Sequence, residues 1–157
     1  MEGFNSYFLQ PGFIFVTPEP YLIQTVLGSC VAVCIWSEAP RIGGMNHYLF
    51  ARSLRGERNA RFGDLSIPYM IHLFRKMGAE RSGLKAHIVG GGQHLHLNSM
   101  IGNENAKIAE EILQKHRIEI ATRDTGGPIS RKVIFNTVTG EIFISKVNKA
   151  WESDWYK

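Results

Sequence analysis

Short apolar runs recur along most of the chain, and their valine, isoleucine and aromatic content is typical of β-strands. Segment 22–36 is almost wholly apolar and contains Gly28-Ser29-Cys30, so it predicts a buried strand on each side of a small-residue bend. Residues 131–136 and 141–147 alternate apolar and polar positions on either side of Val138-Thr139-Gly140, which predicts a hairpin. Further strands are expected at residues 13–16, 42–50, 85–89 and 118–122.

Two other segments repeat apolar residues at helical spacing. The first helix is expected to begin near Asp64 or Ser66, either of which can cap it, and to end at Gly78. Its apolar stripe is predicted to be Leu65, Tyr69, Leu73 and Met77, with Met70 and Phe74 alongside. The second helix is expected at residues 103–116, with Ile108, Ile112 and Leu113 facing inward.

The order of these elements is strand-rich with two helices inserted. It predicts a mixed α/β (α+β) fold, in which a β-sheet or sandwich core carries helices packed outside. Residues 51–63 are polar and rich in arginine and glycine, so a mobile loop is expected there. No repeat, low-complexity tract or linker divides the chain, so residues 1–157 are expected to form a single domain large enough to bury a core.

The composition is that of a globular protein, with 44% hydrophobic and 20% charged residues. No apolar run approaches the roughly 20 residues that span a bilayer, and the first residues lack a basic start leading into an apolar stretch. A cytoplasmic protein without membrane insertion is therefore expected.

The net charge of +4 is small and spread along the chain. The densest basic stretch, residues 52–61, holds four arginines offset only by Glu57. A solvated loop explains it best, an acidic partner surface is second, and nucleic acid is a distant third because no aromatic residues are interleaved.

Two cysteines, Cys30 and Cys34, stand four positions apart. On a strand this spacing separates their Cα atoms by about 13 Å, beyond the reach of a disulfide, so free thiols are expected. Two thiols without further cysteines also make a poor zinc site.

Cys30 follows Gly28-Ser29, where a thiol can be presented beside backbone N–H groups that stabilise an oxyanion. His47 lies 17 residues later, and two antiparallel strands joined by a turn would bring the two side chains together. A cysteine and a histidine form the minimal activated nucleophile, since the imidazole takes the thiol proton and later protonates the leaving amine. On composition alone a buried structural cysteine is the stronger interpretation, and Cys34 fits it better than Cys30 does.

Two other motifs have weaker chemical interpretations. Gly90-Gly91-Gly92 lacks the lysine and serine or threonine of a phosphate-binding loop, so a close-packing turn is expected. His87, His94 and His96 could bind a metal, but no acidic or thiol ligand stands at the usual spacing. Surface histidines are the favoured interpretation.

The ordered set of motifs resembles the CheD family of chemoreceptor glutamine deamidases. Segment 25–34 (TVLGSCVAVC) resembles the nucleophile motif of that family, and segment 44–48 (GMNHY) resembles its histidine motif at the expected distance. Further matches are Phe62-Gly63-Asp64, Val89-Gly90-Gly91-Gly92, Ile101-Gly102-Asn103-Glu104-Asn105, Gly126-Gly127, Arg131-Lys132-Val133 and Thr139-Gly140-Glu141. The resemblance covers about residues 12 to 146.

The resemblance implies a fold similar to the catalytic domain of the cytotoxic necrotizing factor toxins. It implies that Cys30 attacks receptor glutamines through a thioester, with His47 as base and then acid, and that no metal or organic cofactor takes part. The third catalytic residue of the family is a threonine placed about six residues before the cysteine. Gln24 stands there, and the neighbouring Thr25 is assigned to this role, with Gln24 as the alternative. Because neighbours on an extended strand point to opposite faces, Thr25 can replace the threonine only if the backbone bends.

The resemblance also implies two partners for a monomeric protein. Chemotaxis receptors (methyl-accepting chemotaxis proteins) would be the substrates, and a CheC-type phosphatase would be bound and stimulated. A regulatory adaptor with little or no catalysis is the alternative, supported by the departure at Gln24.

Overall fold

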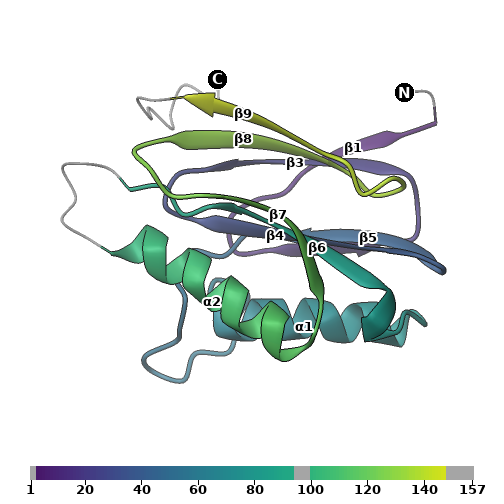
Figure 1. Cartoon of the computed structure of the whole chain (residues 1–157), viewed down its shortest axis with the longest axis horizontal. Helices are drawn as coiled ribbons and strands as arrows, with labels where there is room; N and C mark the ends of the chain where they lie inside the picture. Colours follow the sequence, from purple (N-terminus) through teal and green to yellow (C-terminus); the bar gives the residue numbers. More distant parts are fainter. Residues whose placement is uncertain (1–2, 94–99, 148–157) are drawn as a thin grey trace.

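The computed structural model describes residues 3–93 and 100–147 and arranges them in three layers (Figure 1). One layer is a four-stranded sheet in the order β1 (Asn5–Phe8), β3 (Tyr21–Leu27), β8 (Ser130–Asn136) and β9 (Ile142–Val147). The middle layer is a five-stranded sheet in the order β2 (Ile14–Thr17), β5 (Arg41–Asn46), β4 (Val31–Glu38), β6 (Leu84–Gly90) and β7 (Glu119–Thr125). The helices α1 (Gly63–Lys76) and α2 (Ile101–Lys115) form the third layer, and a short 3-10 helix spans Arg81–Gly83.

Two hydrophobic cores separate the three layers, and β4 contributes to both of them. Val31, Val33 and Ile35 belong to the core beneath the helices. The alternate residues Ala32, Cys34 and Trp36 belong to the core between the sheets. Because successive side chains of a strand point to opposite faces, a strand that is covered on both sides is continuously apolar. This explains the long apolar run in the sequence and confirms a sandwich core with helices packed outside.

The buried face of α1 matches the predicted stripe only in part. Met70 and Phe74 are buried as expected, together with Ile67 and Ile71, whereas Tyr69 is 50% exposed and Met77 is 37% exposed. The predicted and observed stripes lie side by side on the helix, so packing against α2, β2 and β5 selects between them. The predicted N-terminal caps are wrong: α1 begins at Gly63 after Phe62, without a side-chain cap, and Ser66 is buried inside it. The predicted end at Gly78 is confirmed, since Met77 is the C-cap and Gly78 follows it with a φ of +99°.

Most other elements match their predictions within a few residues. The strands on either side of Gly28-Ser29-Cys30 and the β8–β9 hairpin are confirmed, and residues 51–62 lie outside regular helix or strand. β5 ends at Asn46 rather than at residue 50, and α2 begins at Ile101, two residues before its expected start. Strand β1 was not predicted, because all four of its residues are exposed and no buried alternation marks it.

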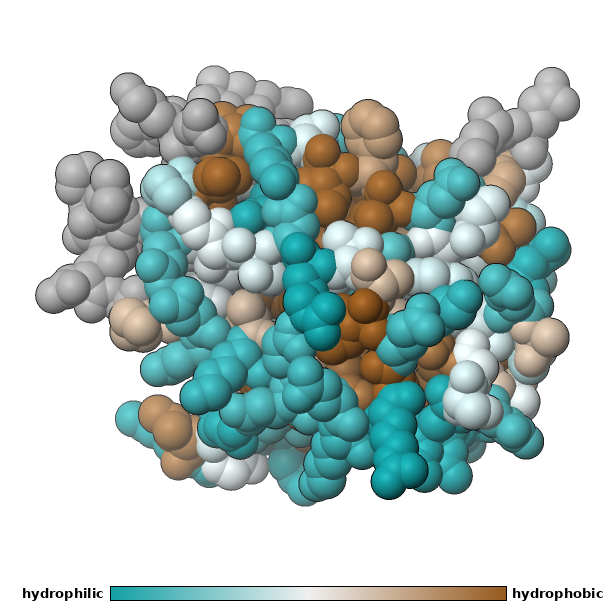
Figure 2. All heavy atoms as spheres, in the orientation of Figure 1, coloured by the Kyte–Doolittle hydropathy of each residue, from teal (hydrophilic) through white to brown (hydrophobic). Residues whose placement is uncertain are grey.

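The outward surface of the helices is polar. Figure 2 shows hydrophilic side chains over the lower part of the molecule, where the helices lie in the matching orientation of Figure 1. Among the described residues, neither helix has the length and apolarity required to cross a bilayer.

Candidate active site

The segment Gly28-Ser29-Cys30 carries the chain from β3 in one sheet to β4 in the other. Gly91 N–H donates to the Cys30 carbonyl at 2.9 Å, and Gly92 N–H donates to the Gly28 carbonyl at 2.9 Å. A Cβ atom on Gly90 would lie 2.3 Å from the Cys30 carbonyl oxygen, and Gly90 has a φ of +117°. The glycine run is therefore a close-packing turn, as predicted, and it supports the bend from one side.

Arg131, from one of the family-like motifs, is buried next to the glycine run and bonds to it. Its side chain is 2% exposed and donates to Asp124 at 3.1 Å, to the Gly90 carbonyl and to the Gly126 carbonyl. A buried guanidinium is tolerated only when its hydrogen-bonding groups are paired in this way. The arrangement fixes the glycine run on which the Cys30 segment rests.

Strand register places Cys30 and His47 on the same face of the five-stranded sheet. β4 and β5 are antiparallel, as the sequence analysis required, and Val31 pairs with Tyr48 in an isolated bridge next to them. Continuing this register sets His47 diagonally from Cys30, where side chains on one face remain within reach. Cys30 is partly buried against the core between the sheets, which also contains Met45 from the same face of β5.

Thr25 meets His47 from the opposite sheet. The Thr25 hydroxyl oxygen lies 2.7 Å from His47 Nδ1, and both side chains are 1% exposed. The same hydroxyl donates to the Leu9 carbonyl at 2.9 Å. Ile23 and Leu27, two positions away on either side, belong to the core between the sheets. Strand alternation therefore turns the intervening Gln24 to the other face, and Thr25 takes the position beside the histidine.

These contacts define the tautomer of His47. A hydroxyl has one hydrogen, and here it is donated to the Leu9 carbonyl, so the oxygen can only accept from His47. Nδ1 therefore carries the ring proton and Nε2 carries the lone pair. Nε2 is buried without a hydrogen-bond partner among the described residues. Burial lowers the pKa of His47 from 6.5 to about 4, so the imidazole is neutral near pH 7 and its Nε2 carries no proton.

Tyr48 follows the histidine and lies completely buried near the same thiol. Burial, and to a smaller extent the charge on Cys30, raise the pKa of its phenol well above the usual value. The phenol donates to the backbone carbonyl of Asn105 in the second turn of α2. Tyr48 and Asn105 stand inside family-like motifs of the sequence, but no local pattern predicts a role for them or for the Leu9 carbonyl.

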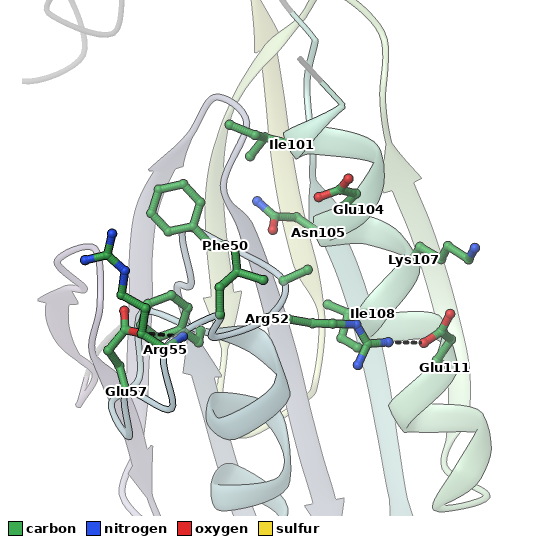
Figure 3. Close-up of a pocket in the computed structure, with 13 residues that line it drawn as sticks. Phe50, Arg52, Arg55, Glu57, Ile101, Glu104, Asn105, Lys107, Ile108 and Glu111 are labelled. Atoms are coloured by element: carbon green, nitrogen blue, oxygen red, sulfur yellow. Dashed lines mark hydrogen bonds and ion pairs between the residues drawn. The ribbon is translucent and has the colours of Figure 1, made fainter.

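A groove of about 650 Å³ lies beside these residues, between the loop after Tyr48 and α2. Its apolar lining comes from Phe50, Phe62, Ile101 and Ile108, and Phe50 is 44% exposed. Figure 3 shows Arg52 reaching across to Glu111, with the ion pair at 2.9 Å. Because both partners are exposed, this pair adds at most about 1 kcal/mol. Asn105 also lines the groove, which links it to the Cys30 segment.

The structure does not support the histidine metal site. His87 is 6% exposed, stacks on Trp36, and its Nε2 lies 2.7 Å from the Gly140 carbonyl oxygen. The prediction of a surface histidine is therefore wrong for His87, because the turn before β9 covers it. His94 and His96 lie outside the described residues. Within residues 3–93 and 100–147, no three His, Cys, Asp or Glu side chains are grouped closely enough to hold a metal ion.

Neither cysteine forms a disulfide, as predicted, and the two differ in exposure. Cys34 is 0% exposed and burial raises the pKa of its thiol far above the usual value, so it should resist alkylation. Iodoacetamide should label Cys30 at least about tenfold faster than Cys34 in the folded protein. Peptide mapping after timed quenching measures both rates. Faster labelling of Cys34 would show that Cys34, and not Cys30, is the reactive cysteine.

The burial of His47 predicts a pH-dependent stability. Since its pKa falls to about 4 in the folded chain and is near 6.5 when unfolded, the unfolded state binds the proton more readily. Its contribution is fully present above pH 6.5 and is lost as the pH falls toward 4, by about 3 kcal/mol. Urea unfolding of wild type and His47→Gln between pH 8 and 4 measures this difference. The exposed His72→Gln variant is the control, and equal pH slopes for wild type and His47→Gln would contradict the prediction.

The fold and the site define a class: an α/β sandwich in which strand register brings a cysteine, a histidine and a threonine together at one end. A family model described as CheD chemotactic sensory transduction matches residues 50–146. A probable chemoreceptor glutamine deamidase CheD 1 of Anaeromyxobacter dehalogenans is 37% identical over 92% of this chain and 86% of its own length. Probable chemoreceptor glutamine deamidases CheD of Sulfurimonas denitrificans and Trichlorobacter lovleyi are 32% and 35% identical, over 93% and 90% of this chain and 97% and 91% of their own lengths. The chain belongs to the CheD family.

Proposed function

We propose that this protein deamidates glutamine side chains of chemotaxis receptors, converting them to glutamate with release of ammonia. The observation that carries the proposal is the buried, unpaired Nε2 of His47, which the Leu9–Thr25 hydrogen bonds set as the basic nitrogen beside the Cys30 segment. The names of the relatives supply the substrate class, since they describe probable chemoreceptor glutamine deamidases.

In the proposed reaction, the Cys30 thiol gives its proton to His47 Nε2 and its sulfur attacks the carboxamide carbon of glutamine. The tetrahedral intermediate collapses as the imidazolium protonates the leaving nitrogen, so ammonia departs and a thioester remains. A water molecule then gives a proton to Nε2 and attacks the thioester carbon. The bond to sulfur breaks, the thiol regains the proton, and glutamate is released. The net change is glutamine plus water to glutamate plus ammonia.

Two groups assist this cycle in the proposal. Backbone N–H groups near Ser29 and Cys30 stabilise the oxyanion of each tetrahedral intermediate. Thr25 acts as a positioning residue: its hydroxyl oxygen accepts a hydrogen bond from His47 Nδ1–H and holds the ring plane without touching the substrate. The imidazolium formed during the reaction remains bonded to the same hydroxyl.

The other expectations from the resemblance stay part of the proposal. The protein would be a cytoplasmic monomer of one domain, would use no metal or organic cofactor, and would resemble the catalytic domain of cytotoxic necrotizing factor toxins in fold. It would also bind a CheC-type phosphatase. A purely regulatory adaptor remains the second candidate, and the position of Thr25 beside His47 weakens its main support, the glutamine at position 24.

Intact mass spectrometry of a receptor cytoplasmic fragment tests the function. Incubation with wild-type protein should add about one mass unit for each glutamine converted to glutamate, and ammonia should appear in equal amount. Peptide mapping then locates the sites. If several candidate receptor fragments gain no mass while the protein still binds a CheC-type phosphatase, the adaptor function replaces the deamidase.

A further inference from the structure

Asn105 connects the segments that carry Cys30 and His47. It stands in α2, far along the chain, yet its Nδ2 donates to the Ser29 carbonyl at 3.0 Å and to the Leu49 carbonyl at 2.8 Å. Ser29 directly precedes Cys30, and Leu49 follows His47 by two residues. The side chain is 0% exposed. One amide therefore joins the two segments of the site from outside the sheet that holds them.

The chemistry of the contact requires an asparagine nitrogen. Both partners are carbonyl oxygens, which only accept, so the atom between them must donate twice. An amide nitrogen has two hydrogens and supplies both bonds. Asn105 Oδ1 is buried without a partner in the described part of the chain. A buried acceptor without a partner is unfavourable, so the two bonds that the amide nitrogen donates account for an asparagine at this position.

The backbone around Asn105 is held as firmly as its side chain. Tyr48, between His47 and Leu49, donates its phenolic hydrogen to the Asn105 carbonyl. In the first turn of α2, a Cβ on Gly102 would lie 2.4 Å from the Gly91 carbonyl oxygen, so helix and glycine run are in direct backbone contact. The position of Asn105 is thus coupled to Tyr48, which follows His47, and to the glycine run that supports the Cys30 segment.

We propose that Asn105 is a positioning residue of the deamidase, which clamps the Cys30 and His47 segments in their reactive arrangement. The hydrogen bond to Ser29 fixes the plane of the Ser29–Cys30 peptide. In a trans peptide the carbonyl and the N–H point in opposite directions, so this bond also sets the direction of the Cys30 N–H, one of the proposed oxyanion donors. The inference rests on the proposed function, and it assigns a role to a residue whose amide nitrogen bonds two backbone carbonyls of the site.

The test compares Asn105→Ala and Asn105→Asp with a matched control, Asn136→Ala. Asn136 also bonds two backbone groups, accepting from Val138 and Thr139 N–H in the turn between β8 and β9. A small misplacement of reacting groups is enough to lower the rate about 10- to 100-fold. Both Asn105 variants should therefore lose about 10- to 100-fold in kcat for receptor deamidation with KM nearly unchanged. Asn136→Ala should retain wild-type kcat at a similar loss of stability.

A second readout needs no receptor. The pH profile for alkylation of Cys30 by iodoacetamide should shift in Asn105→Ala and stay unchanged in Asn136→Ala. If wild type deamidates no receptor, the proposed function fails, while the alkylation profiles still decide whether Asn105 positions Cys30. Unchanged kcat and unchanged alkylation in folded Asn105 variants would overturn the clamp, as would equal losses in Asn136→Ala.

Tyr48→Phe provides a milder variant in case the Asn105 variants do not fold. It removes only the phenolic hydrogen bond to the Asn105 carbonyl and keeps the ring that packs against Gly63. Tyr48→Phe should lower kcat several-fold and shift the pH profile of Cys30 alkylation in the same direction as Asn105→Ala does. Wild-type values for both would also count against the clamp.

Discussion

Replacing Cys30 with alanine should abolish receptor deamidation, with a loss of at least about 10⁴-fold in kcat. In the proposed mechanism no thioester can form without the thiolate, and the remaining backbone and histidine groups could only assist direct attack by water. Intact mass of the receptor fragment should show the gain of about one mass unit per glutamine with wild type alone. The variant should fold, because Cys30 is only partly buried and alanine fits the space.

Cys34→Ala is the matched control for this substitution. Cys34 belongs to the core between the sheets and faces no substrate, so its variant should retain deamidation at some loss of stability. Deamidation by Cys30→Ala at the wild-type rate would exclude Cys30 as the nucleophile. Loss of deamidation with retained binding to a CheC-type phosphatase would show that the enzymatic and regulatory roles coexist and are separable.

Replacing His47 with alanine should lower kcat by about 10²- to 10⁴-fold, the range expected for loss of a general acid and base. Nε2 is the only ring nitrogen available to take the thiol proton, because Nδ1 is bonded to Thr25. Steady-state ammonia release from the receptor fragment measures the effect. His72→Ala, on the exposed face of α1, should leave kcat unchanged. Equal losses in the two variants would contradict the role of His47.

Thr25 variants test whether the orientation of the His47 imidazole matters for activity, because they leave the imidazole itself in place. Thr25→Ser keeps the hydroxyl and should retain most activity, whereas Thr25→Val keeps the shape and removes the bond to Nδ1. Without that bond the imidazole can change tautomer, so Thr25→Val should lose about 10- to 100-fold in kcat. Nitrogen NMR of His47 should show a protonated Nδ1 in wild type and Thr25→Ser, and a mixture in Thr25→Val. Wild-type activity in Thr25→Val would remove Thr25 from the site.

Local signals in the sequence predicted where the strands and helices lie better than they predicted which face of each element is buried. The apolar run that contains Cys30 predicted two buried strands, because a strand covered on both sides has no polar positions. The sequence pattern predicts a stripe on α1 that includes the exposed Tyr69, because two neighbouring apolar stripes exist and only the elements packed against the helix distinguish them. It predicts a surface position for His87 because the turn at Gly140, which covers His87, lies 53 positions later in the sequence.

The residue types permit a chemistry for the site, but they do not define its geometry. A small-residue bend and a spacing of 17 residues are compatible with a Cys30–His47 pair on antiparallel strands, and the resemblance of the surrounding motifs to a known family turns that possibility into a prediction. Whether Gln24 or Thr25 faces the histidine depends on the phase of β3, and that phase is set by its pairing with β8, more than a hundred residues away. The contacts of Leu9 and Asn105 involve backbone carbonyls, which leave no mark in side-chain identity.

By itself, then, the sequence determined the strand-rich α/β class and the bend that carries Cys30, and its motifs predict which thiol and imidazole form the proposed site. Propensity and apolar periodicity act over a few residues, so they carry this information locally. Only the tertiary structure decided which face each strand and helix buries, that Thr25 supports His47, and that Asn105 joins the two segments. These depend on hydrogen bonds and packing between residues distant in the chain, and their free energies exist only once the layers have assembled.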